Sequence, residues 1–200
     1  MKELFKKTAY LLATILVLPL LVPFQFMSWL KGKDVALCDT TEFLALLPGF
    51  FGQYLRNAFL RLTIEYCHPS ARIGFGTTFS KCGARINADV YIGSYCSIGL
   101  ATIGKDALLA SGTYVTSGSH QHGIDDITRP ISLQPGVDQR VTIGEGSWIG
   151  SHTVIMADVG KGAVVAAGAV VSKSIPDFVI AGGVPARVLK SRVEESRPKE

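Results

Sequence analysis

The 200-residue chain lacks several patterns that identify common classes of protein. Its 20 lysines and arginines are not gathered into one stripe with interleaved aromatic residues, so a net charge of +4 does not indicate nucleic-acid binding. The four cysteines include no pair with the two-residue spacing of zinc ribbons or thioredoxin-like motifs. In a chain of this length such cysteines are typical of buried thiols in a reducing compartment, which favours the cytosolic side of a membrane.

Charge is also missing from residues 8–30. This length lies within the roughly 17–25 residues that a helix needs to cross a bilayer. No small-residue cleavage site of a secretory signal is visible after the apolar run. Lysines on both sides favour contact with anionic headgroups but give little orientation. Pro19 and Pro23 should kink or break the helix, so a span and a re-entrant helix are both open, and the prolines favour the re-entrant form.

Two further helices are expected before residue 66. Asp39 and Glu42 have the spacing of a capping box, and the apolar run Phe43–Leu47 follows them. From Phe51 onward, apolar residues recur on one helical face. That face suits an interfacial helix or, alternatively, a helix packed on the domain that follows.

After Pro69, aliphatic or aromatic residues recur about every six positions. The inward candidates are Ile73, Phe79, Ile86, Ile92, Ile98, Ile103, Leu109 and Val115, then Ile143, Ile149, Ile155, Val159, Val165 and Val171. No helix has this period, whereas a coil of short strands does, with each turn covering its neighbour. The predicted fold is mainly β, a parallel β-helix of hexapeptide repeats. We expect a membrane-associated helical anchor in residues 1–66, the β-helix in residues 67–190 and a polar tail in residues 191–200.

The repeat is interrupted from about residue 116 to residue 142 by a polar segment that contains two of the four histidines. Long loops on rigid scaffolds commonly carry function. We therefore expect this loop to contribute to the functional site.

Four elements between residues 70 and 190 resemble the left-handed β-helix acyltransferases, especially the maltose and galactoside O-acetyltransferases and related O-acetyltransferases of surface polysaccharides. They are the repeat, the loop pattern Ser119-His120, Asp126, Pro130-Ile131 and Gln134, the segment Ile143–His152, and the closing segment Gly182–Val188. The left hand of the coil is implied by this resemblance alone.

The resemblance implies a homotrimer that binds acetyl-CoA between neighbouring coils and transfers its acetyl group to a sugar hydroxyl. The catalytic base of the family falls on His120, and histidine suits the removal of a proton from a weakly nucleophilic hydroxyl. Positions that bind coenzyme A in the family fall on Trp148, Ser151, Ala167, Ser172, Lys173 and Arg187. Candidates for acceptor binding are His122, Asp126, Arg129 and Gln134. For Asp126 and Arg129 the alternative role is to pin the loop.

Two departures from the family pattern lie close to the expected groove for coenzyme A. Val165-Ala-Ala-Gly168 replaces a common Ile-Gly-Ala-Gly, and Ile155–Val159 is two residues shorter than usual. The acceptor-side residues of the sugar acetyltransferases are not matched upstream, so the resemblance does not identify the acceptor.

Three alternatives remain open. The enzyme could N-acetylate an amino or nucleotide sugar, or the chain could be a non-catalytic membrane scaffold. The third is a zinc carbonic anhydrase, with His120, His122 and His152 assembled across subunits as ligands, although the β-helical anhydrases have a different histidine spacing. We expect no metal. Because acetyl-CoA is cytosolic, we expect the coil on the cytoplasmic side of a membrane, with a lipid-linked envelope or exported glycan as acceptor.

Overall fold

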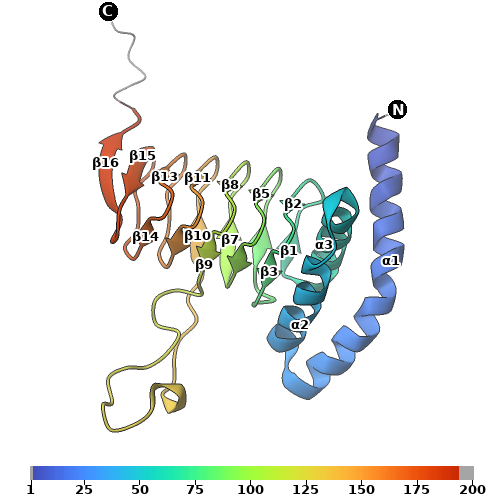
Figure 1. Ribbon diagram of the computed structural model, residues 1–200, viewed down its shortest axis with the longest axis horizontal. Helices are drawn as coiled ribbons and strands as arrows, with labels where there is room; N and C mark the ends of the chain where they lie inside the picture. Colours follow the sequence, from blue (N-terminus) through green and yellow to red (C-terminus); the bar gives the residue numbers. More distant parts are fainter. Residues whose placement is uncertain (1, 194–200) are drawn as a thin grey trace, which may run out of the picture.

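The computed structural model describes residues 2–193, with side chains from residue 8 onward, so most of the expected polar tail lies outside the described residues. Three helices come first: α1 (Lys2–Lys31), α2 (Lys33–Ala45) and α3 (Gly49–Thr63). A coil of short strands with about six turns follows them (Figure 1). The predicted fold class, mainly β with an apolar helical segment in front of a parallel β-helix, is confirmed.

The strands form three sheets, one on each side of the coil, and all neighbouring strands pair in parallel except β15 and β16. The first sheet holds β1 (Tyr66–Cys67), β4 (Arg85–Ile86), β7 (Ala101–Ile103) and β10 (Val141–Ile143). The second holds β2 (Arg72–Ile73), β5 (Tyr91–Ile92), β8 (Leu108–Leu109), β11 (Trp148–Ile149), β13 (Val164–Val165), β15 (Val179–Gly182) and β16 (Arg187–Ser191). The third holds β3 (Thr78–Phe79), β6 (Ser97–Ile98), β9 (Tyr114–Val115), β12 (Val154–Ile155) and β14 (Val170–Val171).

The six-residue period places one inward side chain on each side of every turn. In the second sheet, for example, Ile73 pairs in register with Ile92, which pairs with Leu109. These inward residues are fully buried and form a continuous aliphatic column. Glycine follows many of them because successive corners nearly touch: a Cβ at Gly74 would lie 2.4 Å from the carbonyl carbon of Gly93.

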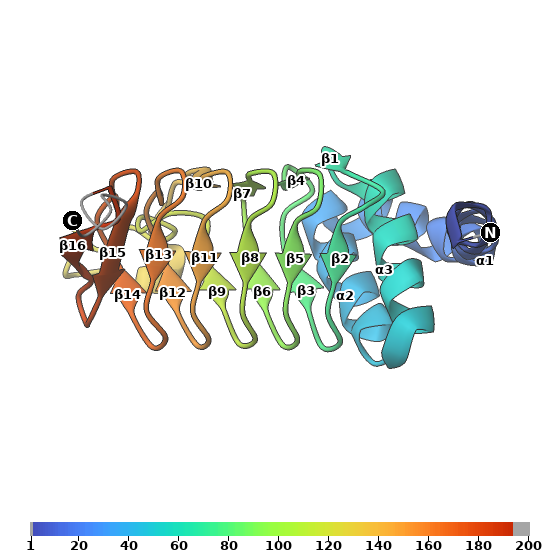
Figure 2. The same cartoon turned by 90° about the horizontal axis from the view of Figure 1, so that it is seen from above.

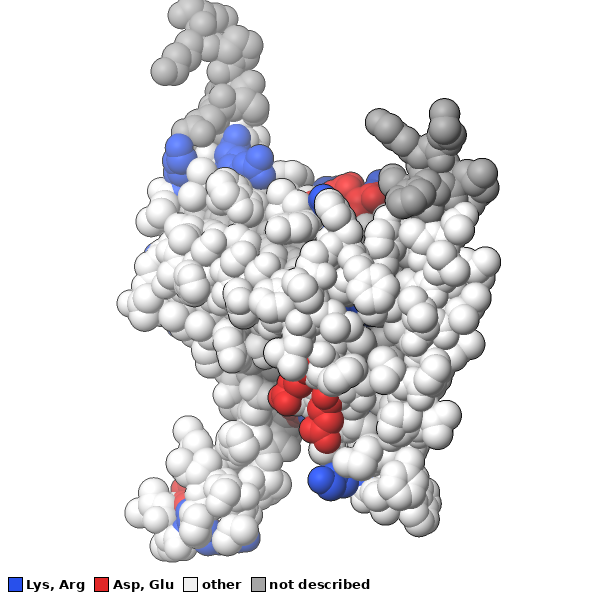
Figure 3. Space-filling model, turned by 45° about the vertical axis from the view of Figure 1, so that its right-hand side comes forward, with Lys and Arg blue, Asp and Glu red and all other residues white. Residues whose placement is uncertain are grey.

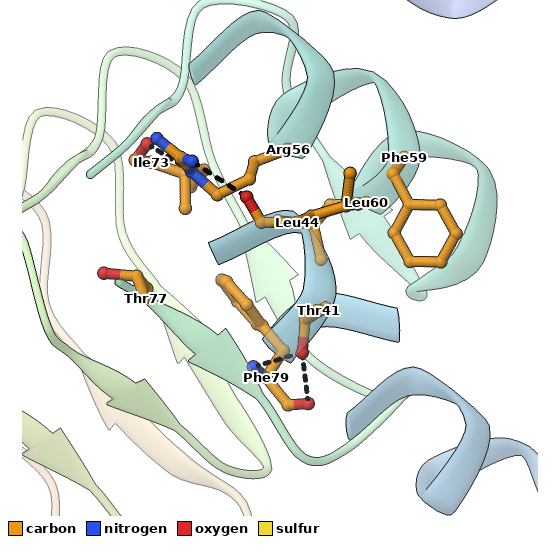
Figure 4. Close-up of a pocket in the computed structure, with 8 residues that line it drawn as sticks. All are labelled: Thr41, Leu44, Arg56, Phe59, Leu60, Ile73, Thr77 and Phe79. Atoms are coloured by element: carbon orange, nitrogen blue, oxygen red, sulfur yellow. Dashed lines mark hydrogen bonds between the residues drawn. The ribbon is translucent and has the colours of Figure 1, made fainter. Parts of the chain in front are cut away.

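The helical layer covers the first turn of the coil (Figure 2). In α2, Thr41 accepts a hydrogen bond from the Phe79 amide at 3.1 Å and lies 3.2 Å from the Phe79 carbonyl. In α3, Arg56 donates to the carbonyls of Ile73 and Leu44, both at 3.1 Å (Figure 4). It also donates to the carbonyl of Leu47 at 2.7 Å. These side chains satisfy polar groups at an edge that would otherwise pair with another chain. At the opposite end, β16 lies antiparallel to β15 and covers that edge.

The structure decides three expectations for the helices. Asp39 and Glu42 lie inside α2, which begins at Lys33, so the predicted capping box is wrong. Leu55 and Phe59 are buried, so α3 is the packed helix rather than a free interfacial one.

The third expectation concerns α1, which runs through both prolines as one helix. Of the two expected outcomes, a kink or a break, no break occurs, and a bend is visible where α1 turns toward α2 (Figure 1). Packing along α2 and α3 stabilises this helix: the ring centroids of Tyr10 and Tyr54 lie 4.8 Å apart, and those of Phe24 and Phe59 5.6 Å.

Candidate active site

The polar loop leaves the coil after β9 and returns at β10, at the corner between the third and first sheets (Figure 1). Two backbone hydrogen bonds close its stem: Val137 donates to the His120 carbonyl at 2.7 Å, and Gln139 donates to the Ser117 carbonyl at 2.8 Å. The stem therefore holds His120 close to the coil, in contrast to the free loop tip.

The imidazole of His120 is exposed, and its Nδ1 lies 2.9 Å from Ser119 Oγ. In the tautomer whose Nδ1–H donates to that hydroxyl, Nε2 carries a lone pair directed away from Ser119. Such a nitrogen can accept a proton from a bound hydroxyl group.

A small cavity of about 90 Å³ lies beside the stem. Its lining includes Ser119, Arg140, Asp158 and Ser174. Arg140 donates to the Gly83 carbonyl at 2.6 Å and to Glu65 Oε2 at 2.8 Å, while Asp158 Oδ1 accepts from the Thr142 amide at 2.7 Å. The cavity has room for about three water molecules. It can therefore accommodate a small polar group but not a whole sugar.

Sequence analysis missed Arg140, Asp158 and Ser174 as lining residues. One signal was present for Asp158: the shortened repeat between Ile155 and Val159 brings this carboxylate to the corner under the loop. The shortened segment Ile155–Val159, one of the two departures from the family pattern, thus lies at the cavity on the loop side of the coil.

The interior of the loop is held by three of the predicted acceptor-binding residues. Gln134 is buried; its Nε2 donates to the carbonyls of Asp126 and Arg129 at 2.8 and 3.0 Å, and its Oε1 accepts from the Asp126 amide at 3.1 Å. Asp126 Oδ1 accepts from the Thr128 hydroxyl and amide, and these bonds lower the pKa of the carboxyl group.

Arg129 donates to the carbonyl of Leu133, which ends the short 3₁₀ helix η1 (Ile131–Leu133). These contacts are those of residues that pin the loop. His122 is exposed on the same loop, and a role of any of the four in acceptor binding stays a prediction.

Three predicted residues for coenzyme A lie together on another side of the coil. Trp148 projects outward from the second sheet, between Leu108 and Val164 in register, and is 54% exposed. Ser151 and Ala167 lie on the next corner in successive turns, where the Gly168 amide donates to the Ser151 carbonyl at 2.8 Å.

The remaining predicted residues for coenzyme A are elsewhere. Ser172 and Lys173 follow β14 and are exposed close to Ser174, which lines the cavity under the loop. Arg187 begins β16 opposite Gly182. His120 thus lies at the corner opposite the second sheet, and one chain does not bring it together with Trp148.

Among the side chains that the structure describes, no group of three or more His, Cys, Asp and Glu residues could hold a metal ion. His120, His122 and His152 therefore do not form a zinc site within one chain. The described part of a single subunit therefore offers no set of zinc ligands for the carbonic anhydrase alternative.

Comparisons with known proteins agree with the motifs. A family profile described as the hexapeptide repeat of succinyl-transferase matches residues 83–117 and 140–173. A putative lipopolysaccharide biosynthesis O-acetyl transferase of Escherichia coli K12 is 34% identical over 134 residues, which cover 62% of this chain and 65% of that protein. A putative colanic acid biosynthesis acetyltransferase of the same organism is 34% identical over 100 residues, 49% of this chain and 51% of that protein. The chain thus spans less than two thirds of the length of these relatives.

Among solved structures, a maltose O-acetyltransferase from Clostridium difficile 630 superposes with a TM-score of 0.67 at 19% identity, covering 80% of this chain and 89% of that one. A galactoside acetyltransferase in complex with coenzyme A gives a TM-score of 0.66 at 22% identity, covering 84% and 86%. These two structures share the fold of the chain. Taken with the repeat profile and the O-acetyltransferase relatives, the predicted resemblance to left-handed β-helix acyltransferases is confirmed.

Proposed function

We propose that this protein is an acetyl-CoA-dependent O-acetyltransferase that acts on a sugar hydroxyl of an envelope or exported glycan. The observation that carries the proposal is the position of His120, held by the loop stem with Nδ1 on Ser119 and next to a small polar cavity. The similarity to sugar and polysaccharide O-acetyltransferases supports the same chemistry.

In this mechanism Nε2 of His120 takes the proton of the acceptor hydroxyl. The hydroxyl oxygen attacks the carbonyl carbon of the thioester, and a new C–O bond forms. As the tetrahedral intermediate collapses, the C–S bond breaks and the proton on His120 passes to the departing thiolate. No covalent intermediate on the protein is needed, and base catalysis of this kind contributes about 10²–10⁴-fold in rate.

The separation of His120 from Trp148 on one coil supports a trimeric site. In a closed threefold assembly, the loop corner of one subunit faces a different side of its neighbour. His120 of one chain and Trp148, Ser151 and Ala167 of the next would then line one groove. Lys173 and Arg187 offer cationic partners for the phosphates of coenzyme A.

Location at the cytoplasmic face of a membrane completes the proposal. The exposed apolar residues of α1 support attachment, and one relative is named for lipopolysaccharide biosynthesis. All four cysteines are free, which suits a reducing compartment. The acceptor that fits this location is a lipid-linked glycan intermediate.

The decisive experiment is calorimetric titration of coenzyme A and acetyl-CoA into the detergent-purified protein and its His120→Ala variant. We expect saturable binding to both, with about one site per chain, and a loss of acetyl transfer of about 10²–10⁴-fold in the variant only. His68→Gln is the matched control, because His68 bonds Ser70 at the entry to the coil, outside the site.

Absence of binding to both proteins at about millimolar ligand would overturn the proposal, and metal analysis would then test the zinc alternative. Transfer to amino sugars but not to hydroxyl acceptors would replace O-acetylation by N-acetylation. Binding of coenzyme A with full activity in His120→Ala would reject the assigned base.

A further inference from the structure

The outward side of α1 is a large apolar surface without a protein partner in the described chain. Nine large apolar side chains on this helix are at least 49% exposed: Leu11, Leu12, Ile15, Leu16, Leu18, Val22, Phe26, Trp29 and Leu30. No charged residue occurs between residues 8 and 30, and Figure 3 shows a broad uncharged face over this part of the molecule. Soluble monomers rarely expose contiguous apolar surface beyond a few hundred Å².

The opposite side of the same helix is already used by the protein. Ala13, Val17 and Phe24 are at most 7% exposed, and they recur at the spacing of a helix-packing seam. This seam packs on α2 and α3, which in turn cover the coil. The sequence of α1 is apolar all round because its two sides face two different apolar environments.

The docked position of α1 is incompatible with a transmembrane orientation. Figures 1 and 2 show the axis of its N-terminal part perpendicular to that of the coil, at the extreme end of the molecule, before the helix bends toward α2. A helix that crossed the bilayer in this position would carry α2 and α3 into the hydrocarbon along its flank. Asp39, Glu42 and Arg61 of those helices would enter too, and each charged side chain there costs at least about 2.5 kcal/mol.

A lipid surface fits the outward side better than a second protein does. Exposed Lys31 and Lys33 stand where α1 meets α2, and Lys2, Lys6 and Lys7 occur at the other end of its sequence. Basic residues that bracket an apolar helix match the charge of anionic headgroups. Trp29, 80% exposed next to Lys31, is a residue type enriched at the membrane–water interface.

We propose that α1 lies flat in the headgroup layer of an anionic bilayer, with its Leu12–Val22 side turned into the acyl chains and the coil standing away from the membrane. This arrangement is neither a span nor a re-entrant hairpin. In other interfacial helices the second side is polar and wet, whereas here it is covered by α2 and α3. The inference deepens the membrane location in the proposed function and does not depend on the transfer chemistry.

Depth-dependent fluorescence quenching tests the orientation, because the chain has only two tryptophans, Trp29 and Trp148. One protein carries Trp148→Phe, so that it reports from Trp29. A second carries Trp148→Phe, Trp29→Phe and Leu18→Trp, so that it reports from the middle of α1. Both are added to phosphatidylcholine–phosphatidylglycerol vesicles with bromine at a shallow or a deep position of the acyl chain.

A flat helix predicts that shallow bromines quench both indoles more strongly than deep ones. A spanning helix predicts shallow quenching from Trp29 but deep quenching from the indole at position 18, and that result would overturn the proposal. Vesicle binding without quenching of either indole would show that another surface binds the lipid, and would overturn it as well.

Vesicle flotation with a matched pair of variants tests the surface itself. Ile15→Ser with Val22→Ser changes only the outward side, and we expect at least tenfold weaker partitioning with unchanged circular dichroism. Leu108→Ser with Tyr114→Ser, on exposed faces of the coil, should leave partitioning unchanged. Equal binding to neutral and anionic vesicles would reject the proposed preference of α1 for anionic headgroups. Detergent-free particles that associate through α1 and do not bind vesicles would identify a second copy as the occupant instead.

Discussion

The coil and α1 are both rich in apolar residues, but they place them on different sides of the backbone. In the coil, Ile92, Ile103 and Ile149 point inward and are fully buried. In α1, Val17 points inward while Leu12 and Val22 point away from the protein. The difference shows that burial within the folded chain explains every large side chain of the column but only one side of this helix.

The largest difference in unfolding free energy is expected between a substitution in the aliphatic column and one on the outer side of α1. Ile103→Ala removes packing that the rigid neighbouring turns cannot replace, and it should cost about 2–5 kcal/mol of unfolding free energy. Leu12→Ala should change that free energy by no more than about 0.5 kcal/mol. Denaturant unfolding in detergent measures both. A comparable loss in the two variants would show that α1 has an unrecognised protein partner.

The second largest loss of stability is expected where the helices contact the first turn of the coil. Arg56→Met removes donors from three carbonyl groups at the buried end of the coil, so it should cost about 1.5–3 kcal/mol. Arg61→Met, on the exposed side of the same helix, is the control. If both substitutions have the same small effect, water replaces the guanidinium and the junction is less rigid than described.

Substitutions on the two sides of α1 should differ less in their effect on stability than substitutions in the coil and in α1. Val17→Ala deletes about two buried carbon groups, worth roughly 1.5 kcal/mol at about 0.8 kcal/mol each. Its effect should appear in the thermal midpoint but not in vesicle partitioning. Val22→Ala should do the opposite. Loss of vesicle binding in Val17→Ala at full stability would reverse the assignment of the two sides.

The smallest effect is expected on the surface of the coil. Hydrogen bonds from Arg85 and Arg140 lower the pKa of Glu65. A carboxyl group with a lowered folded pKa stabilises the protein above its ordinary pKa of about 4.3, and this contribution is lost as the pH falls through the folded value. The difference in melting temperature between the protein and Glu65→Gln should therefore shrink below about pH 4. A difference independent of pH would mean that charge does not contribute at this contact.

The coil could be predicted from the sequence because its period repeats over many turns, and one inward residue per side is enough to define it. The partners of Arg56 could not, because its acceptors are carbonyl groups whose positions depend on where α2 ends. The packed side of α1 could not be predicted either. The helix is apolar all round, so the periodicity of its sequence does not distinguish the packed side from the exposed side.

The candidate site was predictable in part. The family resemblance placed the catalytic base on His120, which stays a prediction, and the structure shows how the stem holds this residue. The contacts of Gln134 and the cavity lined by Asp158 depend on how the loop folds back on itself, which is a property of tertiary structure.

The number of turns between α3 and the loop also determines how far His120 lies from a membrane that binds α1. Its turns stack along an axis perpendicular to the N-terminal part of α1, and the loop leaves after the third turn (Figure 1). With about 4.8 Å per turn and helix layers spaced about 10 Å apart, His120 stands on the order of 25 Å above a membrane that holds α1 flat. For the lipid-linked acceptor proposed above, the nearest sugars would lie below His120 at that height, and hydroxyls farther from the lipid would come within its reach. Adding or removing one complete turn between α3 and the loop would move His120 by about 5 Å, so under the proposed function it should change which sugar is acetylated.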